Sequence, residues 1–230
     1  MTTPPFQRAR RPEHKEQRRR DILEAAATLG LRAGVRAVTL TDVAGEAGVH
    51  KSAVLRYFAS REAVFLLLTG EGWQGWATAV EEGLRGASVA EEGLRGASAA
   101  DGVAAVLVGT LAERPLFCDL LGHAQLHLER GVTQEQVRDF KVVTLDAVER
   151  IAGALIAVLP WLGRGQAVDI VAGTTSMAAQ QWQTSNPPET LARLYAEDPL
   201  LAHAASEFAP RLRRLVGLLL AGAGRSGGVR

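Results

Sequence analysis

Apolar side chains recur at steps of three and four residues along most of this chain, and that spacing is typical of α-helices. The first such stripe consists of Ile22, Ala26, Leu29 and Ala33. It predicts a helix that starts near Glu13 and ends near Gly34. No segment of the sequence sustains the alternation of β-branched and polar residues that indicates a strand. The pattern therefore predicts an all-α fold.

Two short helices joined by a tight turn are predicted within residues 39–58. Thr39 and Asp42 fit a capping box at the start of the first helix, and Gly48 can take the positive φ that ends it. The second helix covers residues 50–57, and the two helices can share one small core. The residues of that core are Val43, Ala44, Val49, Val54 and Phe58. The polar start of the second helix then stays outside, as a helix-turn-helix requires for contact with the DNA major groove.

The rest of the chain is rich in helix-forming residues, with breaks at glycine and proline. Ser60 is a suitable N-cap for a helix that carries residues 63–68. Further helices are expected near residues 73–85, 101–112, 116–129, 134–159, 166–183, 188–195 and 203–221. The segment 81–88 recurs unchanged as 91–98, and we interpret this repeat as a local duplication that lengthens a loop.

Small side chains at 173–178 and an apolar stripe on the last helix suit a four-helix interface between two copies of the chain. That stripe consists of Phe208, Leu212, Leu215 and Leu219. Ordinary packing within one chain is the alternative.

The formal net charge of +1 hides an uneven distribution of charge. Residues 1–61 contain 12 Lys and Arg against 6 Asp and Glu, which gives +6, whereas residues 62–230 contain 14 against 19, which gives −5. The basic N-terminal quarter indicates that this part meets a polyanion, with an uneven surface charge as the alternative. Residues 1–12, with three prolines and three arginines, are expected to form a flexible basic arm.

Several classes of protein are not expected. One cysteine, Cys118, excludes an internal disulfide framework and a four-cysteine zinc site. The longest apolar stretch, 151–163, is interrupted by Pro160 and is shorter than the ~20 residues of a membrane span. The basic start lacks the apolar run of a signal peptide, so a cytoplasmic protein with no membrane partner is expected. No catalytic or phosphate-binding motif is visible, so neither an enzyme nor a cofactor is expected.

Residues 13–68 resemble the DNA-binding domain of the TetR family of bacterial transcriptional repressors. The resemblance depends on the combination of RAGVRAVTL, TDVAGEAGV, KSAVLRYF and SREAVFLLL. It implies a three-helix helix-turn-helix domain (residues 13–61) followed by a larger helical domain that binds an effector and dimerises (residues 62–230). Beyond about residue 70 the resemblance is limited to helical character and length, so it implies no particular ligand.

The resemblance also implies which residues meet DNA. The candidates are Thr39, Thr41, His50, Lys51, Ser52, Ala53, Leu55, Arg56, Tyr57 and Arg61. Lys51 would read guanine, and Tyr57 and Arg61 would bind phosphates, with partial burial in the core as the alternative for Tyr57. Two positions depart from the family pattern: Leu55 stands where a Tyr is frequent, and His50 stands where a Ser or a similar cap is usual.

Aromatic and polar side chains of the larger domain are candidates for a ligand cavity, because such cavities combine apolar walls with a few orienting polar groups. The candidates are Trp73, Trp76, Phe117, His123, Gln125, His127, Met177, Gln181 and Trp182. The alternative is that the aromatic residues fill the core and the polar ones bond to the backbone. His123 and His127, one helical turn apart, with Cys118 upstream, leave open a metal- or redox-responsive site.

The sequence thus predicts a homodimeric regulator that binds a palindromic double-stranded DNA operator and is released from it by an unknown small-molecule effector. A helical adaptor that does not bind DNA is the other alternative.

Overall fold

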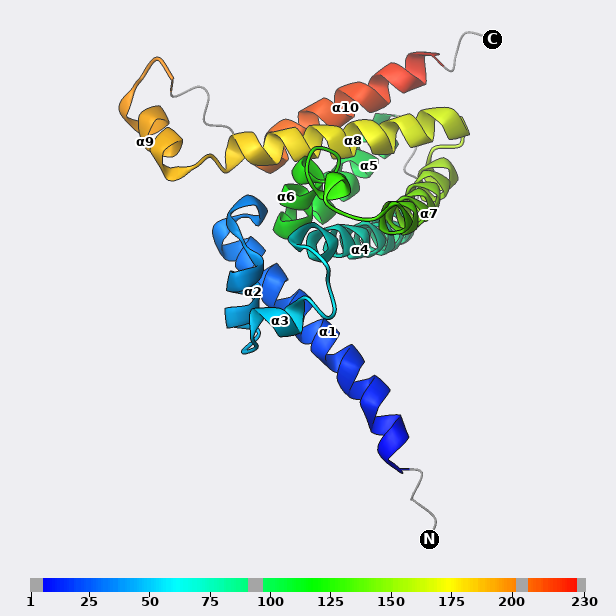
Figure 1. Ribbon diagram of the computed structural model, residues 1–230. Helices are drawn as coiled ribbons and strands as arrows, with labels where there is room; N and C mark the ends of the chain where they lie inside the picture. Colours follow the sequence, from blue (N-terminus) through cyan, green and yellow to red (C-terminus); the bar gives the residue numbers. More distant parts are fainter. Residues whose placement is uncertain (1–5, 91–96, 202–206, 227–230) are drawn as a thin grey trace.

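The computed structural model describes residues 6–90, 97–201 and 207–226, and the regular elements of these residues are all helices (Figure 1). The N-terminal head consists of α1 (Phe6–Ala33), the 3₁₀ helix η1 (Val35–Ala37), α2 (Leu40–Glu46) and α3 (Lys51–Val54). The larger body consists of α4 (Arg61–Ala90), α5 (Ala97–Ala112), α6 (Pro115–His123), the 3₁₀ helix η2 (Leu128–Arg130), α7 (Gln134–Val158), α8 (Arg164–Ser185), α9 (Glu189–Glu197) and α10 (Phe208–Ser226). The predicted all-α fold is confirmed.

Local backbone chemistry fixes the ends of the helices in the head. Gly34 follows α1 with φ of 80°, and Gly48 follows α2 with φ of 64°, a region that side chains with a Cβ rarely enter. The capping box is formed as predicted: the amide of Asp42 donates to the Thr39 hydroxyl, and the amide of Thr39 donates to the Asp42 carboxylate. The Ser60 hydroxyl accepts from the amide of Ala63 at 3.1 Å, so its predicted capping role is confirmed too.

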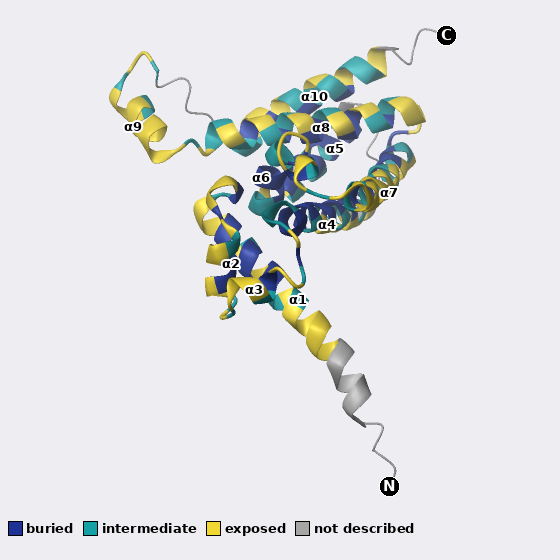
Figure 2. Cartoon of the chain, viewed as in Figure 1, coloured by how far each residue is buried: buried dark blue, intermediate teal, exposed yellow. Residues whose placement is uncertain are grey.

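The body is organised around α4, which packs against α5, α6 and α7. Helix α8 packs against α6, α7 and α10, and α10 closes the body by packing on α5. Leu212, Val216 and Leu220 of α10 are fully buried. Helix α9 projects away from the body, and none of its residues is buried (Figures 1 and 2).

One hydrophobic core runs from the head into the body. Ile22 of α1 and Val54 of α3 belong to the same cluster as Phe65 and Trp76 of α4, and all four are fully buried. Because α4 supplies side chains to both parts, it connects them mechanically. No helix in the described ranges has the length and hydropathy that crossing a membrane requires.

Besides shifts of four or five residues at the start of α5 and at the ends of α10, four boundaries differ from the sequence predictions. The helix α1 already begins at Phe6, within the segment expected to be a flexible arm. The helix α3 ends at Val54, and a hydrogen-bonded turn carries the chain to Phe58. Helix α6 ends at His123, short of residue 129, and the following turn buries Leu128.

The fourth difference is that α4 runs without a break through residues 61–90, where two helices and a loop were expected. Its contacts with α5, α6 and α7 outweigh the low helix propensity of its glycines. The first copy of the repeat, 81–88, therefore lies in a helix and not in a loop, and most of the second copy lies outside the described residues.

Candidate functional site

The α2–α3 unit has one apolar face and one polar face. Val43, Ala44, Val54 and Phe58 are buried, as the sequence predicted for the small core, and α2 packs on α1 and α3. Val49 is partly buried beside them. These residues face inward and Leu55 is exposed, so the start of α3 is left on the outside (Figure 2).

Seven of the ten candidate DNA contacts are exposed on this head. They are Thr39, Thr41, His50, Lys51, Ser52, Leu55 and Arg56. His50 is the N-cap of α3, and its Nδ1 accepts from the amide of Ser52 at 3.4 Å and lies 3.0 Å from the Ser52 hydroxyl. The imidazole therefore takes the place of the usual hydroxyl cap. Lys51 makes no side-chain hydrogen bond or ion pair within the described residues, so its ammonium group is available to a partner.

Arg61 does not lie where the sequence analysis expected it. Its guanidinium group donates to the carbonyl oxygens of Val35 and Val38 and lies 4.9 Å from the centre of the Phe65 ring. One of its nitrogens is also 3.3 Å from the Glu62 carboxylate. These interactions hold η1 against the start of α4, so in this arrangement Arg61 stabilises the head and does not face outwards towards a phosphate.

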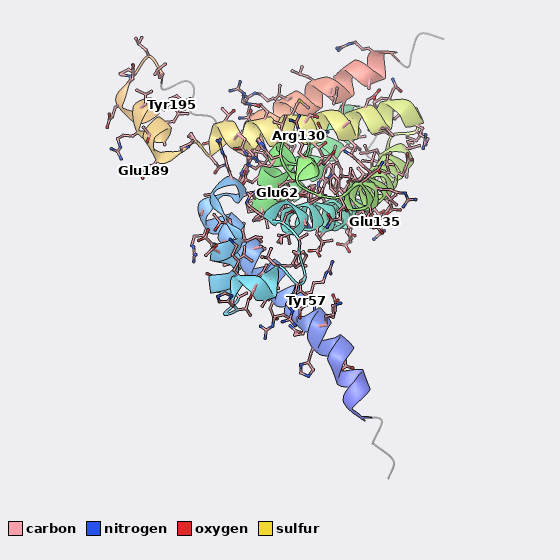
Figure 3. The ribbon with its side chains drawn as sticks, in the orientation of Figure 1. Tyr57, Glu62, Arg130, Glu135, Glu189 and Tyr195 are labelled. Atoms are coloured by element: carbon pink, nitrogen blue, oxygen red, sulfur yellow. The ribbon has the colours of Figure 1, made fainter. Side chains whose placement is uncertain are left out.

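Tyr57 is half-buried and lies at the junction of head and body (Figure 3). It lines a cavity of about 460 Å³ together with Arg19 of α1, Leu67 of α4 and Phe140 of α7. Tyr57 is therefore partly buried, which the sequence analysis gave as the alternative to phosphate binding. Ala53, also half-buried, is the remaining candidate of the ten.

Three of the predicted ligand residues form an aromatic cluster in the core. The ring centres of Trp73, Trp76 and Phe117 lie 5.6–6.2 Å apart. Trp76 is fully buried and donates to the Thr110 hydroxyl at 3.0 Å. A Cβ atom on Gly72 would overlap the Phe117 ring, so this cluster is tightly packed. Trp76 and Phe117 thus serve the core, which was the alternative for the aromatic residues.

A cavity of about 390 Å³ opens between α4, α7, α8 and the turn after α6. Of the predicted ligand residues it is lined by Trp73 and Gln125. It is also lined by Thr144 and Gln183, which the sequence analysis did not single out. The Thr144 hydroxyl is buried without a hydrogen-bond partner in the structure, which is unusual for a buried polar group. A ligand with a polar group would satisfy it.

The other predicted ligand residues lie elsewhere. Met177 packs against the core, and Gln181 is buried and donates to the Ser185 hydroxyl at 3.3 Å. The ring of Trp182 lies edge-on to Phe208, with ring centres 5.4 Å apart. His123 and His127 line a different cavity, next to η1 and η2. The nine candidates therefore do not form one site.

Asp119 of α6 is hydrogen-bonded both to the head and to Gln183, which lines the cavity of about 390 Å³. One of its carboxylate oxygens accepts from the buried amide of Val35 in η1 at 2.7 Å, and the other accepts from the Gln183 side chain at 2.8 Å and lies 3.5 Å from His123. Burial raises the pKa of Asp119, but the interactions with His123, Val35 and Gln183 outweigh it and lower the pKa overall. The sequence held one signal of this role, namely a single carboxylate within the apolar run LFCDLL.

The structure does not support the metal or redox alternative. Cys118 is fully buried and donates to the carbonyl of Leu111, and burial followed by the charge of Asp119 raises its pKa to about 12. A redox-active thiol requires the opposite shift. Within the described part of the chain, no three His, Cys, Asp or Glu side chains gather in a way that would hold a metal ion.

Comparison with known proteins agrees with this architecture. Residues 22–68 match the family described as "Bacterial regulatory proteins, tetR family", and residues 71–226 match "Tetracyclin repressor-like, C-terminal domain". Over 73 residues the chain is 38% identical to the HTH-type transcriptional regulator YfiR of Bacillus subtilis (strain 168). That match spans 32% of each protein, so the chain covers about a third of the length of this curated relative.

Solved structures with the same fold include a TetR-family regulator from Mesorhizobium loti MAFF303099, with a TM-score of 0.54 and 13% identity over 92% of this chain and 96% of that one. The TetR-family regulator PfmR from Thermus thermophilus gives 0.52 and 19% identity over 87% and 97%. The fatty acid degradation regulator FadR from Bacillus halodurans gives 0.52 and 16% identity over 91% and 98%. With the two family matches together spanning most of its length, this chain belongs to the TetR family of transcriptional regulators.

Proposed function

We propose that this protein is a homodimeric repressor that binds a palindromic operator through α3 and leaves it when a small molecule enters the body. The observation that carries the proposal is the start of α3, where Lys51 and Ser52 are exposed while Val54 is fully buried. This short helix is therefore fixed to the head by one face and presents the other to a partner. A lysine at such a position can donate to the O6 and N7 atoms of guanine in the major groove.

Two heads are needed for a palindromic site, and α10 is the best candidate surface for pairing two copies. Leu218 of α10 is 69% exposed, and Leu215 and Leu219 beside it are half-buried. A large exposed apolar residue with apolar neighbours favours an interface. Gly173 of α8 serves packing within one chain, since a Cβ there would lie 3.0 Å from Leu219 of the same chain. Two copies joined through α10 would offer two α3 helices to successive major grooves, about 34–36 Å apart.

The effector is expected in the cavity lined by Trp73, Thr144 and Gln183. Trp73 provides an aromatic wall, and the Thr144 hydroxyl provides an unused hydrogen-bonding group. Gln183 links this cavity to Asp119, and Asp119 binds the amide of Val35 in the head. A ligand that competes for Gln183 would therefore weaken a contact between body and head. It can shift the operator affinity only by the difference in its own affinity for the two arrangements.

Fluorescence anisotropy with a duplex from the region upstream of the gene tests the proposal. Lys51→Ala should lower the affinity about tenfold or more, the equivalent of one good base contact. Arg138→Ala on α7 is a matched control, because its guanidinium group is exposed and lies 3.9 Å from Asp139. Raising the salt concentration should weaken binding by the wild type steeply, since phosphate contacts release counterions. Absence of binding by the wild type, or equal affinity of Lys51→Ala, would reject α3 as the DNA-reading element and would favour the adaptor alternative.

A further inference from the structure

The cavity that His123 and His127 line has a volume of about 550 Å³, lies at the junction of head and body, and is rich in basic side chains. Arg36 reaches it from η1 in the head, and His123, His127 and Arg130 reach it from the end of α6 and from η2 in the body. Figure 3 labels Arg130 and, from α4, Glu62, which also lines this cavity. Basic groups from both parts of the molecule thus face one space.

The carboxylates in and around this cavity are already engaged. Glu62 lies 3.3 Å from Arg61, and Glu129 is paired with Lys141 at 2.7 Å. Asp119 accepts from the amide of Val35 and from Gln183. None of these acidic groups forms an ion pair with the two outer arginines.

Arg36 and Arg130 have no ion pair and no side-chain hydrogen bond within the described residues. His127 is exposed, and its ring lies beside that of His123, with 5.7 Å between ring centres. Two uncompensated guanidinium groups and the imidazole of His127 therefore line one concave surface, beside His123, which lies 3.5 Å from Asp119. Guanidinium groups bind phosphate and carboxylate through paired, charge-assisted hydrogen bonds.

We propose that this cavity binds a small polyanion carrying phosphate or carboxylate groups, held between Arg36 of the head and Arg130 of the body. The anion would span the same junction as the hydrogen bond between Val35 and Asp119, since Val35 and Arg36 are neighbours in η1. Its occupancy would therefore change how firmly the head is held. This regulatory consequence rests on the proposed DNA-binding function, whereas binding of the anion does not.

Calorimetric titration of the full chain without DNA, at constant ionic strength, tests the site itself. The two probes are pyrophosphate and citrate, and binding of only one of them would identify the anionic group that the site accepts. Arg36→Ala and Arg130→Ala should each weaken binding about tenfold or more, because each removes a charge-assisted contact. Arg138→Ala and Lys51→Ala should bind the anion as the wild type does, because neither residue lines the cavity.

Failure of both anions to bind, or an equal loss in Arg138→Ala, overturns the proposal. A loss in Lys51→Ala equal to that in Arg130→Ala would show that the anion occupies the DNA-reading face, and this also overturns it. If the site stands, a saturating anion should change the operator affinity of the wild type and leave that of Arg130→Ala unchanged. An unaltered affinity in the wild type would refute the regulatory consequence alone.

Discussion

Replacing Asp119 with alanine should destabilise the fold through one specific atom, the amide nitrogen of Val35. That amide donates to the Asp119 carboxylate at 2.7 Å, and Val35 is fully buried. Gln183, which donates to the other carboxylate oxygen, is exposed and can turn to water once the carboxylate is gone, and His123 lies further away, at 3.5 Å. The loss of stability therefore comes mainly from the amide of Val35, which stays buried but no longer has an acceptor.

The magnitude follows from the cost of an unsatisfied buried donor, about 1–3 kcal/mol. Taking about 2 kcal/mol, and a shift of about 2–4 °C per kcal/mol for a chain of this size, the Tm should fall by about 4–8 °C. Differential scanning calorimetry on the wild type and Asp119→Ala measures it directly. Asp139→Ala is the control, because the Asp139 side chain is 68% exposed and lies 3.9 Å from Arg138. It should change the Tm by less than about 1 °C, in keeping with the small value of exposed ion pairs.

The lowered pKa of Asp119 adds a test in acid. A carboxyl whose pKa is lower in the folded state contributes stability above its unfolded pKa, about 3.9, and loses it as the pH falls through the folded pKa. The difference in Tm between the wild type and Asp119→Ala should therefore be constant near neutral pH and shrink below about pH 4. A Tm of Asp119→Ala equal to that of the wild type at pH 7 would refute the reasoning, and so would a difference that grows in acid.

Three further substitutions or modifications follow from burial and backbone geometry. Burial raises the pKa of Cys118 to about 12, so iodoacetamide at pH 8 should label the thiol far more slowly in the folded protein than in urea; equal rates would mean that the thiol is accessible. Gly48→Ala should lower the free energy of unfolding by about 1–2 kcal/mol because φ is 64° at this position, whereas Gly45→Ala within α2 should raise it by about 0.5–1 kcal/mol. Urea unfolding measures both values, and two changes of the same sign would contradict this prediction. Leu218→Glu should shift the protein from dimer to monomer in light scattering, while Leu145→Glu on α7, 62% exposed, should not; a dimeric Leu218→Glu would move the interface elsewhere.

The parts of the fold that the sequence predicts are those fixed by interactions within a few residues. The capping box joins Thr39 to Asp42, and the turn at Gly48 depends on one backbone angle. The stripe of α1 correctly predicts that Ile22, Ala26 and Leu29 are buried, whereas its fourth residue, Ala33 at the end of the helix, is exposed. Such signals are visible because the partners lie within one helical turn of each other in the sequence.

The contacts that define the sites connect residues far apart in the chain, and periodicity says nothing of them. The pattern indicates that one face of a helix is buried but not which element covers it. From the sequence, Arg61 is therefore interpreted as a free cation, because its hydrogen-bond partner Val35 is 26 residues away. Trp73 and Trp76 share a helix and a residue type, yet one lines a cavity and the other fills the core. Which of the two happens is decided by the packing of α6, α7 and α8 on α4.

The hydrogen bonds that hold η1 come from two helices, α4 and α6. Arg61 binds the carbonyls of Val35 and Val38 from the first turn of α4, the part of that helix next to the head. The amide of Val35 also donates to Asp119 of α6, at 2.7 Å. Ser60 likewise donates to the carbonyl of Gly131, beyond η2, at 2.9 Å. Under the proposed function, a ligand would act on the head through Asp119, which accepts from Gln183 of one cavity, or through Gly131, which lines the other.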